Sequence, residues 1–542
     1  MTFDYVIGVD AGTGSVRAGV FDLEGALLGH AVRDIQLWRP NEDFVEQSSA
    51  DIWKQTGEAT REALGRAGVH PASIVGIAFD AACSLVALDS KFCPITVSPG
   101  GNAEHNVIVW MDHRAVDQAR RINATRHPLL KYVGGVMSPE MEPPKLLWLR
   151  ENMPHTWKKS AKFLDLADYL TMQATGLDIR SLCTTVCKWA FDGRNGRWNP
   201  SFYAKLGMED LLLKNKIGTT ILPMGSFAGE LTAEAAQHLG LTTRTRVAVG
   251  IIDAHAGGIG VMGMGFTTTP KPAALERVLA LIGGTSSCHM AVSRSPHFIK
   301  GIWGPYRNAM IPDLWLTEGG QSATGSLLEF IIRSSSRFEI MAAEARGRGV
   351  GMYEYLNTLV ADIKQREMEG PAIVKDIHIL PYFLGNRSPH ADPSARGMIS
   401  GLALDDSFDA MARLYYAAIQ AVAYGTRHII EEMNANGYAI KRIHACGGGT
   451  RNPLWLQEHA DITGCEIILP REPEAVLLGA AVLAAVGAGK YPTIMDAAVR
   501  MSAVGQRYPP KKKHARFHGA KYHVFRKMYE HFQSYQNTME RF

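Results

Sequence analysis

The segment Val9–Arg17, VDAGTGSVR, brings together the kinds of group that hold a phosphate chain. Glycine lets backbone N–H groups approach phosphate oxygens closely, and hydroxyl or cationic side chains add further donors. Here Thr13 and Ser15 supply hydroxyls, and Arg17 supplies a forked guanidinium. Asp10 ends an apolar run, where a carboxylate can hold hydrated Mg²⁺ through water. The segment therefore predicts a phosphate-binding turn, and the alternative is a tight hairpin whose glycines only turn the chain.

A second glycine turn follows about half a chain later. Gly283–Ser286, GGTS, stands between the apolar runs LALI and CHMAV, just as Gly12 and Thr13 stand between two apolar runs. A dinucleotide-binding G-x-G-x-x-G turn should lead into a helix, whereas the chain after Gly12 re-enters a strand. Two such hairpins predict two related domains that face each other, each supplying one phosphate-binding turn.

The elements that position these turns alternate between strand and helix signals, as parallel α/β domains require. Residues 5–10 and 16–22 predict the first hairpin, and a helix is predicted from Ser48 toward Gly68. Other predicted elements are strands over 74–79, 279–282, 288–292, 440–445 and 466–469, helices over 408–422 and 452–463, a buried Ala- and Gly-rich helix over 475–489, and a closing helix with an aromatic stripe over 522–532.

Length and composition restrict the class of protein. A chain of 542 residues is too long for one ordinary core, so two or more domains are expected. Its 46% hydrophobic and 20% charged residues indicate a globular protein, and a formal charge of +4 does not point to nucleic acid or a membrane as partner. The basic run 511–516 is interpreted as a solvated cluster. The Gly-, Thr- and Pro-rich segment 263–274 predicts a boundary between domains 1–268 and 269–542.

The cysteines and the N-terminal residues favour a cytoplasmic protein. Seven cysteines are scattered along the chain, without any CxxC pair. Cys183 and Cys187 stand closest together, but no His or Cys cluster beside them in the sequence completes a zinc site, so reduced core thiols are expected. The first residues, MTFDYV, lack the cationic start of a secretory signal, and the apolar run 475–489 is too short to span a membrane.

Taken together, several blocks of the chain resemble the FGGY family of carbohydrate kinases, within the wider superfamily of sugar kinases, chaperones and actin. Besides the two turns, these blocks are VWMDHRA at 109–115, GIIDAHAGGIG at 250–260, EGGQSATG at 318–325, GGGTRN at 447–452 and QEHADITG at 457–464. The resemblance implies an α/β fold of two duplicated actin-like ATPase (ribonuclease H-like) domains. ATP, Mg²⁺ and a small sugar are expected in the cleft between the domains, and a homodimer is expected as the assembly.

The resemblance also implies roles for individual residues. Asp253 is expected to accept the proton of the attacking sugar hydroxyl, Asp10 to hold Mg²⁺ through water, and Arg17 to offset phosphate charge. The structural alternative makes Asp253 the N-cap of a helix, and His255 is expected to be a hydrogen-bonded neighbour rather than a second base. The residues expected to contact ATP are Gly12, Thr13, Ser15, Gly284, Thr285, Gln321, Gly448, Gly449 and Asn452.

A further set of residues is expected to bind the sugar. Trp110 would lie flat against the carbon chain, and Asp112 would accept hydrogen bonds from hydroxyls. The alternative is a buried Trp110 with a structural pair of Asp112 and Arg114. Lys188 and Glu318 resemble sugar-contacting residues of ribulokinases. The alternative interpretation is that each is an ordinary residue on the protein surface. The full expected set is Ala82, Cys83, Trp110, Asp112, Lys188, Asp253 and Glu318.

The segment 79–89, FDAACSLVALD, indicates which sugar is expected. It resembles the pentulose kinase branch, in which D-ribulose kinases tend to carry T-C-S-L-V, with Ala82 replacing the Thr here. Small side chains at Ala82 and Cys83 leave room for a substrate longer than glycerol. The prediction is ATP-dependent phosphorylation of D-ribulose to D-ribulose 5-phosphate. The alternatives are a kinase for L-ribulose, xylulose, ribitol or another polyol, an actin- or chaperone-like ATPase, and a non-catalytic sugar-responsive protein.

Overall fold

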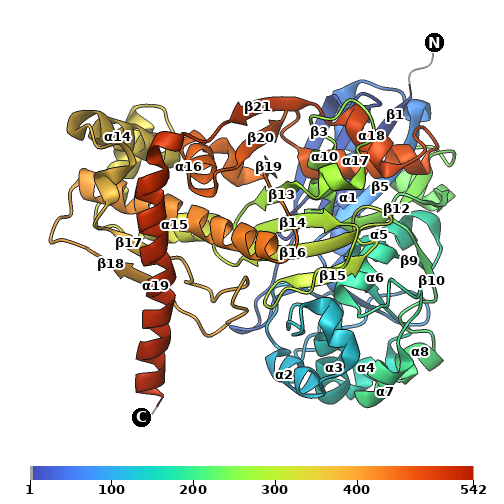
Figure 1. Cartoon of the computed structure of the whole chain (residues 1–542). Coiled ribbons are helices and arrows are strands. Elements are labelled where there is room, and N and C mark those ends of the chain that lie inside the picture. Colours follow the sequence, from blue (N-terminus) through green and yellow to red (C-terminus); the bar gives the residue numbers. More distant parts are fainter. Residues whose placement is uncertain (1–3, 541–542) are drawn as a thin grey trace.

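The computed structural model describes residues 4–540 and divides into two halves, each built on one large sheet (Figure 1). The first sheet has six strands in the order β11-β12-β5-β1-β2-β3. Its central strands β1 and β2 form an antiparallel hairpin, and β5 runs parallel to β1. The bounds are β1 Tyr5–Ala11, β2 Ser15–Asp22, β3 Leu27–Asp34, β5 Ile74–Ala81, β11 Phe227–Glu230 and β12 Arg246–Ile252.

The second sheet repeats the same nucleus. Its order is β15-β16-β14-β13-β19-β20-β21, in which β13 and β14 form an antiparallel hairpin and β19 runs parallel to β13. The bounds are β13 Val278–Gly283, β14 Ser287–Ser293, β15 Trp303–Arg307, β16 Trp315–Gln321, β19 Arg442–Cys446, β20 Glu466–Pro470 and β21 Val504–Tyr508. Both predicted hairpins are therefore confirmed, each with a glycine turn at its tip.

The predicted helices form where the capping signals place them. α1 (Ser49–Ala67) begins after Ser48, whose side chain accepts a hydrogen bond from the Asp51 backbone, and it ends at Gly68 in the left-handed conformation, with φ 65°. In the second half, α15 (Phe408–Ala435) and α16 (Pro453–Thr463) confirm the predicted apolar periodicity and pack against each other.

The remaining elements cover the sheets or form small sheets of their own. The other helices are α2 Val116–Ala124, α3 Glu142–Asn152, α4 Pro154–Lys159, α5 Leu166–Thr175, α6 Leu182–Lys188, α7 Pro200–Lys205, α8 Asp210–Leu213, α9 Ala233–Leu239, α11 Pro272–Leu275, α12 Gly325–Arg333, α13 Phe338–Gly347, α14 Met352–Glu367 and α18 Ile494–Met501. The short strands are β4 Glu46–Gln47, β6 Leu85–Leu88, β7 Val107–Ile108, β8 Lys162–Asp165, β9 Ile179–Ser181, β10 Thr220–Leu222, β17 His378–Leu380 and β18 Met398–Ser400. Within residues 4–540, no helix is long and apolar enough to cross a bilayer.

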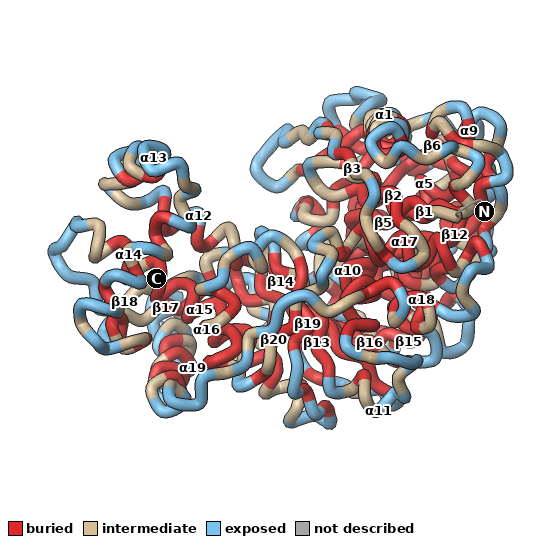
Figure 2. Tube along the Cα trace, turned by 90° about the horizontal axis from the view of Figure 1, so that it is seen from above, coloured by how far each residue is buried: buried red, intermediate tan, exposed pale blue. Residues whose placement is uncertain are grey.

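Two helices, α10 (Asp253–Met262) and α17 (Ala475–Gly487), pack tightly against each other where the two halves meet (Figure 1). A Cβ at Gly260 would lie 2.0 Å from the Ala475 carbonyl oxygen, and one at Gly479 would lie 1.9 Å from the Ala256 carbonyl oxygen. α17 also packs on β1, β5 and β12, although it lies late in the chain. The buried Ala- and Gly-rich helix is thus confirmed, and its small residues allow backbones to approach closely. Figure 2 shows buried residues continuing from one half to the other through α10.

A substitution at this contact is expected to destabilise the whole fold. Gly479→Ala places a methyl group against rigid backbone, and we expect it to lower the free energy of unfolding by about 1–3 kcal/mol. Gly519→Ala is the matched control, because nothing lies within 4 Å of a Cβ at that helical position. The control is expected to be slightly more stable than the native chain. Denaturant unfolding of both variants measures the difference, and equal stabilities would contradict the close contact.

The chain closes with α19 (Ala515–Met539), which crosses the second half in Figure 1. Tyr522 and Phe525 are buried in a cluster with Tyr424, and Tyr529 and Phe532 pack against it, as the aromatic stripe predicted. The Lys521 ammonium donates to the Val374 carbonyl oxygen at 2.7 Å. The preceding lysines at 511–513 are exposed, which agrees with a solvated basic cluster.

Candidate active site

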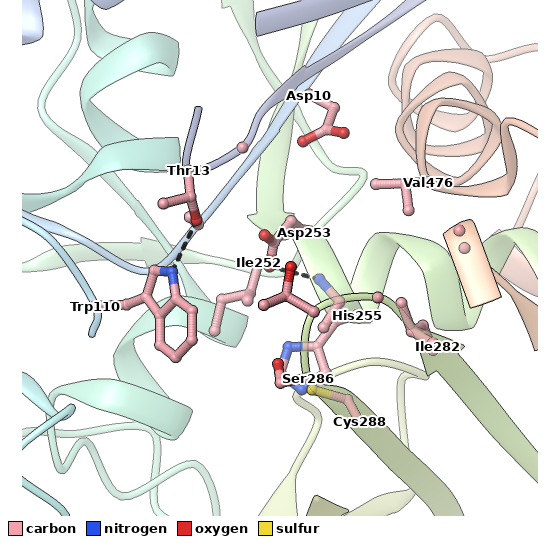
Figure 3. Close-up of a pocket in the computed structure, with 18 of the residues that line it drawn as sticks. Asp10, Thr13, Trp110, Ile252, Asp253, His255, Ile282, Ser286, Cys288 and Val476 are labelled. Atoms are coloured by element: carbon pink, nitrogen blue, oxygen red, sulfur yellow. Dashed lines mark hydrogen bonds between the residues drawn. The ribbon is translucent and has the colours of Figure 1, made fainter. Parts of the chain in front are cut away.

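A cavity of about 420 Å³ lies between the two halves, and both glycine turns line it. Figure 3 shows Thr13 and Ser286 from the two turns on either side of Asp253. Thirteen of the residues predicted from the sequence line this cavity: Asp10, Gly12, Thr13, Arg17, Ala82, Cys83, Trp110, Lys188, Asp253, Gly284, Thr285, Glu318 and Gly448. Residues from segments hundreds of positions apart therefore meet in one place, as a cleft between duplicated domains predicts.

The two turns are stabilised by similar backbone hydrogen bonds. The Gly12 N–H donates to the Ser15 carbonyl oxygen at 3.0 Å, and the Gly284 N–H donates to the Ser286 carbonyl oxygen at 2.8 Å. The loop 447–450 lies directly against the second turn, since a Cβ at Gly447 would lie 2.5 Å from the Gly283 carbonyl oxygen. Gly447 also has a φ of 93°, which favours glycine. Three glycine-bearing loops thus converge on one end of the cavity.

A buried group of charges lies beside the first turn. Asp10 pairs with Arg17 across the hairpin, and Arg17 also donates to Glu474 Oε2 at 3.1 Å. Asp10 on β1 is in register with Asp80 on the parallel strand β5. The Oδ1 atom of Asp10 and both carboxylate oxygens of Asp80 are buried, with no hydrogen-bond partner among the described residues. Burial, together with the charge of Asp10, raises the pKa of Asp80.

Asp80 was not among the residues predicted from the sequence. The sequence pattern that could have identified Asp80 is a carboxylate near the end of an apolar strand, which is the pattern that identified Asp10. The free Oδ1 of Asp10 and the two free oxygens of Asp80 are suited to a hydrated divalent cation, because Mg²⁺ prefers oxygen ligands and keeps several of its waters. The arrangement of Asp10 and Asp80 therefore fits the water-mediated Mg²⁺ site expected from the resemblance.

Asp253 is the first residue of α10, directly after strand β12. The N-cap is Ile252, so the alternative in which Asp253 caps the helix is wrong, and the contact of its Oδ1 is with the adjacent Ala254 N–H at 2.6 Å. Burial and the charge of Asp10 raise the pKa of Asp253 to about 6, while the Ala254 N–H, His255 and Lys188 act in the opposite direction. The carboxylate thus lies at the cavity wall, with a pKa suited to a general base.

Three residues predicted to bind the sugar, Trp110, Lys188 and Glu318, also line the cavity. The indole Nε1–H of Trp110 donates to Thr13 Oγ1 at 2.9 Å, the dashed contact at the left of Figure 3. Lys188, at the end of α6, is buried, and its ammonium lies 4.6 Å from the centre of the Trp303 ring. Glu318 on β16 is also buried. The surface alternatives for Lys188 and Glu318 are therefore wrong, since both side chains line a cavity.

Asp112 does not line the cavity, and its predicted contact with the sugar is wrong. Both of its carboxylate oxygens accept hydrogen bonds from Arg114, at 2.8–3.0 Å, and Oδ2 also accepts one from the Val45 N–H at 2.7 Å. Arg114 in turn donates to Glu46 Oε1 at 2.8 Å. The buried structural pair, which was the alternative interpretation, is what the structure contains.

Four of the residues predicted to contact ATP also lie outside the cavity: Ser15, Gln321, Gly449 and Asn452. The Gln321 amide donates to the Val422 carbonyl oxygen and to Thr426 Oγ1, both at 3.1 Å, so it ties β16 to α15. Asn452 caps α16, and its amide donates to the Tyr415 hydroxyl at 2.7 Å. The polar atoms of these two side chains bond to protein groups and connect neighbouring elements of the second half.

Arg387 and Glu140 also line the cavity, and sequence reasoning missed both. The Arg387 guanidinium reaches across from the second half to Glu140 of the first half, with Nη2 3.4 Å from Oε1. It also lies 5.3 Å from the ring centre of Trp303. No short motif links residues so far apart in the chain, so only the fold reveals this ion pair between the halves.

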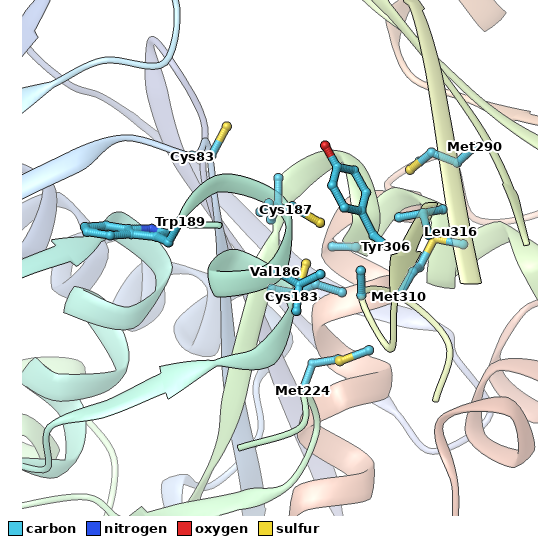
Figure 4. Close-up of a cluster of buried hydrophobic side chains, with 14 of the residues drawn as sticks. Cys83, Cys183, Val186, Cys187, Trp189, Met224, Met290, Tyr306, Met310 and Leu316 are labelled. Carbon is cyan, nitrogen blue, oxygen red and sulfur yellow. The ribbon is translucent and has the colours of Figure 1, made fainter. Parts of the chain in front are cut away.

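Cys183 and Cys187 are buried free thiols, as predicted, but the fold places beside them a histidine that is distant in the sequence. Cys183 and Cys187 lie on α6, and His255 lies beside them, with ligand atoms of all three within 4.8 Å of one another. Figure 4 shows both cysteines on the same helix, next to Tyr306 and Met310. The Sγ atom of Cys183 lies 3.3 Å from His255 Nδ1, and Glu318 lies on the other side of the ring. His255 therefore lies between the Cys183 thiol, to which Nδ1 is hydrogen-bonded, and the Glu318 carboxylate, which Nε2 contacts as an ion pair.

Comparisons with known proteins agree with this geometry. Residues 5–260 match the model of the FGGY family of carbohydrate kinases, N-terminal domain, and residues 279–488 match the C-terminal domain model of the same family. A human protein described as an FGGY carbohydrate kinase domain-containing protein is 46% identical over 99% of this chain and 98% of its own length. The D-ribulokinase of Saccharomyces cerevisiae is 38% identical over 89% of this chain and 71% of its own length.

Solved structures show the same fold at lower identity. The xylulose kinase of Rhodospirillum rubrum has a TM-score of 0.79 and 24% identity, covering 98% of this chain and 99% of that one. The predicted actin-like fold of two duplicated α/β domains is thereby confirmed, and a cavity lined by both glycine turns and Asp253 suits transfer of phosphate to a hydroxyl group. The chain belongs to the FGGY family of carbohydrate kinases.

Proposed function

We propose that this enzyme transfers the γ-phosphate of ATP to D-ribulose, forming D-ribulose 5-phosphate and ADP. The observation that carries the proposal is the position of Asp253, which lines one cavity together with both glycine turns and with the sugar-side residues Trp110, Lys188 and Glu318. A hydroxyl next to Asp253 could then face the terminal phosphate of a nucleotide bound at the turns. The choice of sugar is supported by the similarity to a protein named D-ribulokinase.

In the proposed reaction, the sugar O5 attacks the γ-phosphorus, a new O–P bond forms, and the bond between this phosphorus and the bridging oxygen of ADP breaks. Asp253 accepts the hydroxyl proton, which is needed only late in a loose phosphoryl transfer. Backbone N–H groups near Gly12 and Gly284 provide donors for phosphate oxygens, and Arg17 contributes positive charge at the same end. Arg17 is already paired with Asp10 and Glu474, so its charge is partly offset before ATP binds.

A magnesium ion belongs to this proposal. Asp10, with Asp80 beside it, would hold the ion through water, and the bound ion would offset the negative charge of the phosphates. Arg387 and Glu140 would join the two halves at the sugar side, where closure excludes water and so suppresses hydrolysis of ATP.

A substrate panel tests the proposed sugar. ADP release is measured with D-ribulose, L-ribulose, D-xylulose, ribitol, xylitol, L-arabinitol and glycerol, each at several concentrations. We expect D-ribulose to give the highest kcat/KM and glycerol to give little turnover, because Ala82 and Cys83 leave space that glycerol would not fill. A higher kcat/KM with another member of the panel would replace D-ribulose as substrate. Turnover without any sugar would favour the ATPase alternative.

The pH dependence of kcat/KM tests Asp253 in the native enzyme. Burial raises the pKa of this carboxyl to about 6, and the base must be ionised to accept a proton. Activity is therefore expected above this pKa and is expected to fall about tenfold per pH unit below it. An acid limb centred near pH 4, the ordinary value for Asp, would contradict the environment described for Asp253. Measurements at fixed ionic strength and saturating Mg²⁺ separate this limb from loss of the metal.

A further inference from the structure

At the wall of the cavity, three titratable side chains form a buried series of contacts. Cys183 Sγ lies 3.3 Å from His255 Nδ1, and His255 Nε2 lies 3.3 Å from Glu318 Oε2. Cys183 is fully buried, and His255 is 1% exposed. Of the three, Glu318 and His255 line the cavity whereas Cys183 lies behind them. The Glu318 carboxylate thus contacts the His255 imidazole, and the imidazole in turn contacts the Cys183 thiol.

The contacts among Cys183, His255 and Glu318 connect three elements from both halves of the molecule. Cys183 lies at the start of α6, where the Ser181 side chain caps the helix. His255 lies on the first turn of α10, and Glu318 lies on β16 of the second sheet. The contact between His255 and Glu318 therefore links the helix that carries Asp253 to the opposite wall of the sugar side.

The electrostatic environment favours the ionised forms of all three side chains, Cys183, His255 and Glu318. Burial alone would lower the pKa of His255, but the adjacent Cys183 and Glu318 raise it to about 10. Burial would also raise the pKa of Cys183 and of Glu318, yet contacts with Cys187 and His255 lower that of Cys183, and the imidazolium lowers that of Glu318 to about 2. A cation between two anions is the arrangement that keeps a buried charge stable.

We propose that His255 is a positioning residue, anchored by Cys183 through Nδ1, that holds the Glu318 carboxylate in the orientation in which it binds the sugar. The proposal rests on the proposed function, in that Glu318 must contact the sugar. An unsupported carboxylate on a strand could rotate, whereas one paired on its outer side keeps a free oxygen directed into the cavity. His255 is then required for sugar binding without touching the reacting atoms.

Three variants separate the two contacts of His255. His255→Ala removes both contacts. In His255→Gln the terminal amide can still donate to Glu318, although the bond to Cys183 is lost. Cys183→Ser keeps the volume and a hydrogen-bonding hydroxyl but removes the negative charge. We expect the sugar KM to rise at least about tenfold in His255→Ala and by less in His255→Gln, while the KM for ATP changes by less than about twofold.

The pH dependence of the sugar KM distinguishes a positioning role of His255 from a merely structural one, because a structural role would not make the sugar KM depend on pH. The titratable groups around His255 are Cys183 and Cys187 of α6, Glu318 of β16 and Asp253, and Lys188 lies near Glu318. In the native enzyme His255 stays protonated through neutral pH. Its charge does not change between about pH 7 and pH 9, so it should not alter the sugar KM in this range. In Cys183→Ser the charge that raises the pKa of His255 is lost. The pKa of the ring should then fall, and the sugar KM should rise above its native value at the pH where Glu318 loses its ionic partner.

The experiment measures sugar and ATP KM values for all variants, using whichever panel sugar the native enzyme phosphorylates best. A native enzyme that prefers another sugar overturns only the D-ribulose assignment, because the variants are then compared on that sugar. Sugar KM values within about twofold of native in His255→Ala, or equal increases in both KM values, would overturn the positioning role. Should His255→Ala fail to fold, the nearly isosteric Cys183→Ser decides: a sugar KM within about twofold of the native value at every pH overturns the proposal, and a larger increase at high pH supports it.

Discussion

Replacing Asp253 with Asn is expected to lower kcat by about 10³-fold or more, while sugar and ATP still bind. The amide has nearly the same shape as the carboxylate, but it cannot accept the proton of the attacking hydroxyl. Because Asp253 occupies the first position of α10 and its side chain accepts, among residues 4–540, one hydrogen bond, from the adjacent Ala254 N–H, the substitution leaves the helix and its capping intact. Removal of a buried carboxyl with a raised pKa should leave the stability of the fold little changed.

Single-turnover ADP release measures the loss of transfer, and calorimetric titration measures binding of sugar and ATP. Asp313→Asn is the matched control, because that side chain is 93% exposed and lies outside the cavity. The control is expected to keep native kcat. A kcat within about tenfold of native in Asp253→Asn would remove Asp253 from its role as general base, and loss of sugar binding would make it a binding residue instead.

Much of the fold could be predicted from local signals. The two hairpins follow from apolar runs that flank glycine turns, and the ends of α1 follow from Ser48 and Gly68. The partners of α17 could not be predicted, although its Ala- and Gly-rich sequence indicated close packing. Those partners are Gly8 on β1 and Gly260 on α10, and nothing local to residues 475–487 indicates which distant backbone comes near.

Prediction of the site was accurate where one short segment carries its own chemistry. The turn around Gly12 and Thr13 and the start of α10 at Asp253 both line the cavity. Pairings over long sequence distances were missed, namely Arg387 with Glu140 and His255 with Cys183. Asp112 shows the opposite error, because a residue type suited to sugar hydroxyls is equally suited to a buried arginine two positions away.

Replacing Asp10 with Asn is the second change with a large expected effect. It removes one negative charge that lies next to both Arg17 and Asp80. Arg17 loses its buried partner and keeps only Glu474, and Asp80 remains as the single carboxylate of the facing pair. If Asp10 holds the magnesium ion through water, we expect kcat to fall at least about 100-fold and half-saturation to need a higher Mg²⁺ concentration. Titration of ADP release with Mg²⁺, at constant free ATP, measures both effects.

Asp22→Asn is the matched control for Asp10→Asn. Asp22 ends the other strand of the same hairpin and accepts hydrogen bonds from the Glu24 and Ala26 N–H groups at 2.9 and 2.8 Å, which the amide oxygen of Asn can also accept. It carries the same charge as Asp10 but lies outside the cavity, so its Mg²⁺ dependence should remain native. A fall in kcat without any change in Mg²⁺ dependence would assign Asp10 to orienting Arg17 alone. Native values for both quantities would exclude Asp10 from the phosphate end of the site, because a buried carboxylate that serves the reaction cannot lose its charge without effect.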